Sequence, residues 1–247
     1  MKQFWIMSGL VAGALVLGGL IVYGHDLMGG APRAVAPAQT EGKLPWQVER
    51  TGNGDSVAMG LHLSPDAARA STLGDVRGLW GPDTQIAIIA APGEDGTLEA
   101  FVDPAQAGFI AGKVVVTAAL PAEAVRGMRE RAIKSEFMES TTRKYTLAPA
   151  DLDAALKAPI TALAFIPQAN LDADTVIARF GTPAERLRSN GHLEHFLYPD
   201  KGLDIALDTE GKELLQYVAP ATFEARLRAP LQTAISASQP ASAGAQP

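Results

Sequence analysis

The first hydrophobic feature of the chain is an uninterrupted run without a charge, from Phe4 to Tyr23. At about 1.5 Å per residue, a helix of this length spans about 30 Å, which is the thickness of the hydrocarbon core of a bilayer. Trp5 and Tyr23 lie near its ends, where aromatic rings favour the membrane interface. We therefore expect residues 1–28 to form an N-terminal transmembrane helix that anchors the chain.

A cleaved signal peptide is the alternative interpretation of this segment. The apolar region of a signal peptide is shorter, about 7–15 residues, and a cleavage site follows it closely. Here the best small-x-small triplet, Ala34–Ala36, lies well downstream, which favours an uncleaved anchor. Lys2 precedes the span, and positive charge on that side favours a cytoplasmic N-terminus. In a bacterium, this orientation predicts a single-pass inner-membrane protein with its soluble domain in the periplasm.

Two segments without hydrophobic periodicity flank the part of the chain that we expect to fold. Residues 29–44 are rich in Pro, Ala and Gly and predict a semi-extended tether. Residues 232–247 are small and polar and predict a disordered tail. Residues 45–231 lie between them and are numerous enough to bury a core.

Two stretches of the folded part share one helical pattern. Each begins with a residue suited to cap a helix, Ser71 or Thr72 in the first stretch and Asp172 in the second. Two apolar positions on one helix face follow, and then a glycine and a proline that end the helix. At an offset of 100 residues, Val76 corresponds to Val176, Trp80 to Phe180 and Gly81 to Gly181. The repeat suggests an internal duplication, although helix–Gly–Pro punctuation is also common by itself.

Short apolar runs bounded by Gly and Pro follow each of these helices and predict strands. They cover residues 85–90, 98–102 and 113–118 in the first stretch, and 193–197, 203–207 and 214–218 in the second. Helices at 121–133 and 221–228 close the two units, while strands at 145–147 and 160–166 flank a helix at 149–157. We therefore expect an α+β fold with two similar units, residues 45–134 and 135–231, each a helix followed by an antiparallel β-meander.

The second unit resembles a known family. Its helix, its Gly-x-Pro and its meander are similar to the SmpA/OmlA (BamE-like) small outer-membrane lipoproteins and to the related β-lactamase-inhibitor-protein-like fold. The residues that carry the resemblance are Val176, Phe180, Gly181, Pro183, Tyr198, Gly202, Leu203, Ile205, Leu207, Asp208, Gly211, Tyr217 and Val218. The resemblance implies a non-catalytic domain that offers its sheet or rim to another protein. Those lipoproteins begin with a lipidated cysteine, which this chain lacks, so no partner or contact residue is transferred.

Composition excludes several kinds of function. The net charge of −6 and the pI near 5.2 argue against nucleic acid as a partner, because phosphate binding needs clustered Lys and Arg. The absence of cysteine excludes disulfides, thiolate metal sites and a cysteine nucleophile.

The search for catalytic chemistry centres on the histidines. His25 lies beside the predicted span and His62 precedes the first helix, so only His192 and His195 form a cluster. On a strand these two residues point to opposite faces, which does not suit metal binding. The chain has no Gly-x-Ser-x-Gly elbow, P-loop or Gly-x-Gly-x-x-Gly motif. We therefore predict no catalytic, cofactor-binding or metal-binding residue, no cofactor and no enzyme activity.

Large aromatic rings are the remaining candidates for interaction. Trp80 and Tyr217 lie at core positions of the predicted elements, whereas Trp46, beside Pro45, suits either the core or a partner.

Together these patterns predict a membrane-anchored, non-catalytic periplasmic protein that binds other envelope proteins as an accessory or assembly factor. Two alternatives stay open. One is an inhibitor of an envelope hydrolase that inserts an exposed loop such as Pro92–Thr97. The other is an anchored hydrolase of unrecognised type that uses His62, His192 or His195. We expect the membrane and envelope proteins as partners, and neither nucleic acid nor a small-molecule cofactor.

Overall fold

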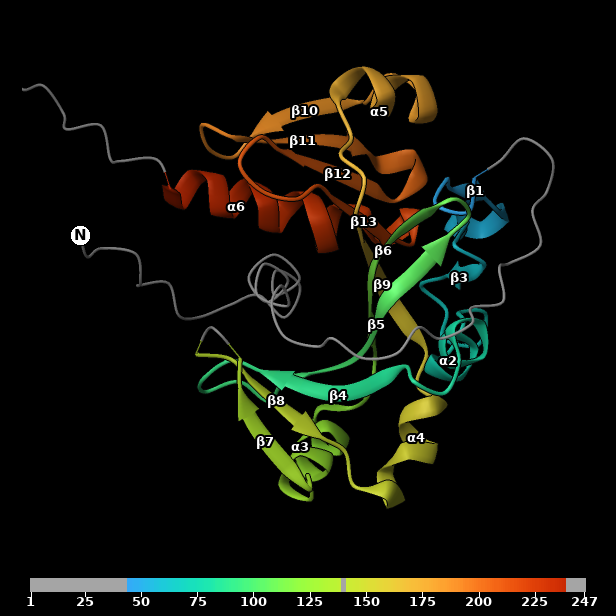
Figure 1. Ribbon diagram of the computed structural model, residues 1–247, viewed down its shortest axis with the longest axis vertical. Coiled ribbons are helices and arrows are strands. Elements are labelled where there is room, and N and C mark those ends of the chain that lie inside the picture. Colours follow the sequence, from blue (N-terminus) through green and yellow to red (C-terminus); the bar gives the residue numbers. More distant parts are fainter. Residues whose placement is uncertain (1–43, 139–140, 239–247) are drawn as a thin grey trace, which may run out of the picture.

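The computed structural model describes residues 44–138 and 141–238. Its main feature is a ten-stranded antiparallel sheet in the order β10-β11-β12-β13-β9-β6-β5-β4-β8-β7 (Figure 1). The strands are β4 (Gln85–Ala90), β5 (Thr97–Ala107), β6 (Ile110–Ala118), β7 (Lys134–Phe137), β8 (Arg143–Thr146), β9 (Ile160–Pro167), β10 (Glu185–Arg188), β11 (Leu193–Tyr198), β12 (Leu203–Asp208) and β13 (Leu214–Val218). A smaller sheet contains β1 (Glu49–Arg50), β2 (Ser56–Ala58) and β3 (Leu61–Leu63).

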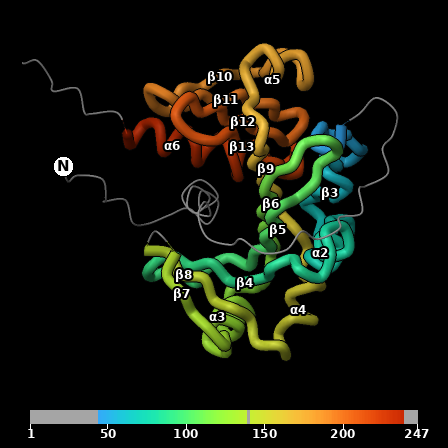
Figure 2. The backbone as a smooth tube through the Cα atoms, in the orientation of Figure 1, coloured from blue at the N-terminus to red at the C-terminus, as the bar shows by residue number. Residues whose placement is uncertain are grey.

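Helices cover both faces of the large sheet. The α-helices are α2 (Leu73–Trp80), α3 (Ala122–Glu130), α4 (Leu152–Leu156), α5 (Ala173–Phe180) and α6 (Ala229–Ser238). Single turns are η2 (Gly52–Gly54), η3 (Pro149–Asp151), η4 (Pro199–Lys201) and η5 (Pro220–Thr222), and η6 (Glu224–Arg228) is a π-turn. The sheet curves, with α6 on its inner face and α2, α3 and α4 on its outer face (Figures 1 and 2).

Helices α2 and α5 begin and end as the sequence pattern predicts. The Thr72 hydroxyl and the Asp172 carboxylate each accept a hydrogen bond from the backbone N–H three residues later. Each helix ends at a glycine with positive φ, 94° at Gly81 and 85° at Gly181, a conformation that other residues adopt at a cost. The two caps therefore confirm the predicted helix boundaries.

The predicted fold class was wrong. We expected two similar helix-plus-meander units, whereas the structure is mostly one ten-stranded antiparallel sheet with few helices. The two expected meanders end in strands β6 and β13, and each would leave an unpaired edge. Strand β9 removes both edges because it pairs with β6 and β13 at once, with Ala164 opposite Val115 on one side and Gln216 on the other.

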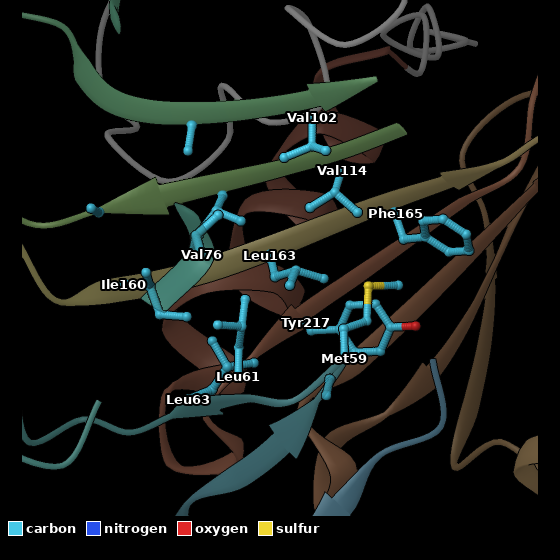
Figure 3. Packing of buried hydrophobic residues seen from close by; sticks show 14 of the residues in the cluster. Met59, Leu61, Leu63, Val76, Val102, Val114, Ile160, Leu163, Phe165 and Tyr217 are labelled. Atoms are coloured by element: carbon cyan, nitrogen blue, oxygen red, sulfur yellow. The ribbon is translucent and has the colours of Figure 1, made fainter. Parts of the chain in front are cut away.

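The core also extends across both expected units. Leu61 and Leu63 of β3 and Met59 of the turn before it pack with Val76 of α2, and the cluster continues to Tyr217 of β13 (Figure 3). The central strands of the large sheet contribute Val102, Val114, Leu163 and Phe165. Because burying apolar surface is the dominant favourable term in folding, a shared core joins the expected units into one body.

Trp46 belongs to this core, which decides between its two predicted roles. Its ring is 3% exposed and lies 5.5 Å from the ring of Phe180, centroid to centroid. The Tyr217 hydroxyl donates a hydrogen bond of 2.7 Å to the Trp46 carbonyl. Trp80 and Tyr217 are buried as predicted.

The two ends of the chain complete the comparison with the sequence. The predicted transmembrane segment, at residues 1–28, and most of the predicted tether lie outside the described residues. Of the residues that the structure describes, none belongs to a helix with the length and apolar character needed to cross a bilayer. Residues 232–238, which we expected to begin a disordered tail, belong to α6 instead, because Leu231 and Ile235 pack against the sheet.

Candidate functional site

His62 lies in a polar cluster under the small sheet. The buried Asp55 carboxylate accepts hydrogen bonds from the Ser64 hydroxyl at 2.9 Å and from Arg69 Nε at 2.8 Å. The hydrogen bond from Arg69 is the largest cause that lowers the pKa of Asp55, and with the Ser64 hydroxyl it outweighs burial, which raises this pKa. His62 Nε2 lies 3.5 Å from Asp55 Oδ2 and 3.4 Å from the Thr51 hydroxyl.

This cluster does not form a nucleophilic relay. A relay needs the acid on one ring nitrogen of the histidine and the hydroxyl on the other. Both partners of His62 approach the same nitrogen, and Ser64 donates directly to Asp55 instead of to a histidine. The cluster fixes β2 and β3 to the loop that follows them, which is a structural role.

Two further histidines of the described residues, His192 just before β11 and His195 within it, each pair with an aspartate of β12. His192 Nδ1 lies 2.7 Å from Asp208 Oδ1 in a partly exposed position. The Asp208 carboxylate raises the pKa of His192 above its usual value. His195 Nδ1 lies 2.9 Å from Asp204 Oδ2, and Gln216 Nε2 donates to the same oxygen at 3.2 Å.

The His195 cluster is buried, with His195 1% and Asp204 2% exposed. Its residues share a sheet face with Leu197, which packs against α6, because side chains two positions apart on a strand point the same way. His195 Nε2 is buried and has no hydrogen-bond partner among the described residues. The sequence predicted opposite faces for His192 and His195 but gave no sign of the buried Asp204 partner.

Metal binding finds no support in the part of the chain that the structure describes. No group of three or more His, Cys, Asp or Glu side chains comes together there in a way that suits an ion.

Glu99 is a further titratable group on the inner face of the sheet, opposite Ala87 and Thr117 in the strand register. Burial raises its pKa to about 7, although the Thr97 hydroxyl donates a hydrogen bond of 2.7 Å to its carboxylate and opposes this shift. No sequence motif marked this residue.

A groove of about 580 Å³ lies on the outer face of the described chain, and we call it the hairpin groove. It lies between α3, the β7–β8 hairpin and the turn that joins β4 to β5. Its lining residues are Ala90, Ala91, Pro92, Gly93, Glu94, Asp95, Arg129, Phe137, Thr141, Arg143 and Tyr145.

Phe137 and Arg143 define the chemistry of the hairpin groove. The Phe137 side chain is 68% exposed, and the Arg143 guanidinium stacks over its ring at 4.0 Å from the centroid. Arg143 also donates a 3.4 Å hydrogen bond to the Ser135 hydroxyl but has no carboxylate partner within the described ranges. Aromatic residues and arginine are the types enriched at protein–protein interfaces.

The rim of the hairpin groove is fixed in place. Arg129 donates to the backbone carbonyls of Glu94 and Asp95, and Arg126 forms an ion pair of 3.2 Å with Asp95. A second depression of about 510 Å³ lies beside α2, but its charged residues Arg69 and Asp75 are engaged within the fold, with Asp55 and in the α2 cap. The hairpin groove is therefore the better candidate site.

Comparisons with known proteins give no match: no family model, no curated protein and no solved structure is significantly similar to this chain. The resemblance of residues 176–218 to the SmpA/OmlA lipoproteins stays a prediction.

Proposed function

We propose that this chain is a membrane-anchored, non-catalytic protein of the bacterial periplasm that binds another envelope protein through the hairpin groove. The anchor in this proposal is the uncharged segment from Phe4 to Tyr23. The partner segment that suits the groove carries an acidic side chain for Arg143 and an apolar side chain for the ring of Phe137.

The observation that carries the proposal is the stacked Arg143–Phe137 pair. The half-buried Arg143 guanidinium has no carboxylate partner in the described chain. Such a group pairs with a carboxylate from another protein, often through two parallel hydrogen bonds. The adjacent ring supplies apolar area that water covers in the unbound state. The three histidines in the described residues, by contrast, each lie beside a carboxylate of the fold, and the Thr51 hydroxyl approaches the same nitrogen of His62 as Asp55 does, which does not form a relay.

Site-specific photo-crosslinking of the full chain in intact cells tests this proposal. A photoreactive residue at Glu94, on the exposed rim of the groove, is expected to capture one discrete protein partner, and Arg143→Glu is expected to abolish the adduct by charge repulsion. The control position is Phe109, which is 70% exposed at the tip of the β5–β6 hairpin and outside the groove. Capture at Phe109 equal to that at Glu94, or capture unchanged by Arg143→Glu, would contradict groove binding.

Membrane anchoring has a separate test. The full chain is expected to stay in the membrane fraction after alkaline extraction, and a chain without residues 1–28 is expected to be released. Protease added to the periplasmic side should digest the soluble domain. Release of the full chain by alkali would refute the anchor.

Inhibition of an envelope hydrolase is the second candidate function, favoured by the loop Pro92–Thr97. Pro92, Gly93 and Glu94 are exposed. The next residue, Asp95, is held by α3, because Arg129 donates to its carbonyl and Arg126 pairs with its carboxylate. A loop that is already ordered loses less conformational entropy on binding. If the adduct at Glu94 is a hydrolase, this candidate predicts that the purified chain lowers its activity and that Arg129→Ala, which releases the loop, weakens the inhibition.

A further inference from the structure

Strand β7 is an open edge of the ten-stranded sheet. It is last in the strand order, and among the residues that the structure describes it pairs only with β8; all four of its residues are exposed. Figure 2 shows it at one end of the curved sheet. At the opposite edge, the charged side chains of β10 are already engaged, Arg186 with Glu194 and Glu185 with Arg228. An open edge with unpaired backbone groups is a template for a further strand.

The backbone groups available on β7 follow from its register. The Met138 N–H donates to the Thr142 carbonyl at 3.0 Å, so the hydrogen-bonded pairs with β8 fall at even-numbered residues of β7. The backbone groups of Ser135 and Phe137 therefore point away from β8. Ile133 lies in the bend before β7, and its N–H donates to the carbonyl of Thr146, the residue opposite Lys134, at 3.0 Å, so regular pairing ends at Lys134.

The charged side chains of β7 complement themselves when two copies run antiparallel. With Ser135 opposite Ser135 of a second copy, Lys134 faces Glu136 of that copy on one face of the sheet. On the other face, Phe137, which is 68% exposed, stays beside Arg143 in the hairpin groove, while Ile133 lies in the bend that precedes β7. Within one chain, Lys134 Nζ and Glu136 Oε1 already form an ion pair of 2.7 Å, so pairing would create a network of alternating charge. Opposite charges directly across from each other stabilise antiparallel strands.

We propose that two copies of this chain associate through their β7 strands, antiparallel and in register about Ser135, to form a continuous sheet across a two-fold axis. The Ser135 N–H of each copy then donates to the Ser135 carbonyl of the other. The contact closes on itself, because a two-fold axis presents the same strand from both copies and leaves no further open edge there.

Cysteine trapping tests the register, since the natural chain has no cysteine. Ser135→Cys places two thiols opposite each other across the axis, and the full chain in detergent is expected to form a disulfide-linked dimer under mild oxidation. Lys134→Cys and Glu136→Cys are matched controls on the same strand. Each is expected to cross-link poorly alone and well when the two variants are mixed. Cross-linking of Ser135→Cys no faster than that of the exposed control Phe109→Cys would overturn the proposal.

Charge reversal tests the same contact without a covalent bond. Lys134→Glu and Glu136→Lys each place like charges opposite each other at both symmetric positions, and each is expected to weaken self-association about tenfold or more. Mixing the two variants restores opposite charges across the axis, so a heterodimer is expected by analytical ultracentrifugation. A monomeric natural chain at high concentration, or a mixture no more associated than either variant alone, would refute self-pairing. Unchanged circular dichroism spectra would show that both variants fold.

Discussion

Strands β11 and β12 carry two histidine–aspartate pairs with the same chemistry and different burial, which allows an internally controlled prediction. His195 and Asp204 are 1% and 2% exposed. The side chains of His192 and Asp208 are 37% and 18% exposed. The perturbation is Asp204→Ala, compared with Asp208→Ala. Each change removes the carboxylate and leaves the histidine in place.

The expected magnitudes follow from what each change leaves unpaired. Without Asp204, the Nδ1 group of His195 and the side-chain amide of Gln216 both lose their acceptor in a buried position. Removing one partner of a buried, hydrogen-bonded pair costs about 3–5 kcal/mol, so we expect Asp204→Ala to lower the free energy of unfolding by about that amount. Without Asp208, water reaches His192, and a partly exposed pair contributes about 0–1 kcal/mol.

Thermal unfolding followed by circular dichroism separates the two cases. For a chain of this size, about 1 kcal/mol shifts the melting temperature by about 2–4 °C, so Asp204→Ala is expected to lower it by about 6–20 °C and Asp208→Ala by less than about 4 °C. Equal shifts for the two variants would refute the reasoning that burial decides the energetic importance of these pairs.

Other predictions concern single side chains. Because the folded state raises the pKa of Glu99 from 4.5 to about 7, it binds more protons than the unfolded state in that window, and stability falls as pH rises through it. Glu99→Gln should therefore raise the free energy of unfolding at about pH 8, by at most about 3 kcal/mol, and with it the melting temperature. At about pH 4 it should change neither, and an effect of the same size at both pH values would contradict this prediction. Tyr217→Phe leaves the buried Trp46 carbonyl unpaired and should cost about 1–3 kcal/mol in a urea titration, whereas no cost would imply another donor. NMR titration of His192 should give a pKa above its usual value, and Asp208→Asn should lower it, because the neighbouring carboxylate is the main cause of the shift.

The proposed groove and the proposed dimer edge were beyond the reach of sequence analysis for a physical reason. Arg143 and Phe137 belong to neighbouring strands of a hairpin, and Arg129 comes from a helix that packs on the same face. Their convergence depends on β8 joining the sheet beside β4, with Tyr145 opposite Ile88. Residues 134–137 alternate too weakly in polarity to reveal a strand, and an exposed edge strand has no buried face to impose such a pattern.

The sequence by itself determined the local elements of this fold. Thr72 and Asp172 cap α2 and α5, Gly81 and Gly181 end them, and most apolar runs of the chain became strands, because caps, turns and periodicity act over a few residues. Only the tertiary structure decided how the strands join. One strand, β9, pairs with β6 and β13 at once and turns two expected meanders into a single sheet. Pairing partners lie far apart in the chain and are selected by shared burial and by the need to satisfy strand edges, which no local pattern records.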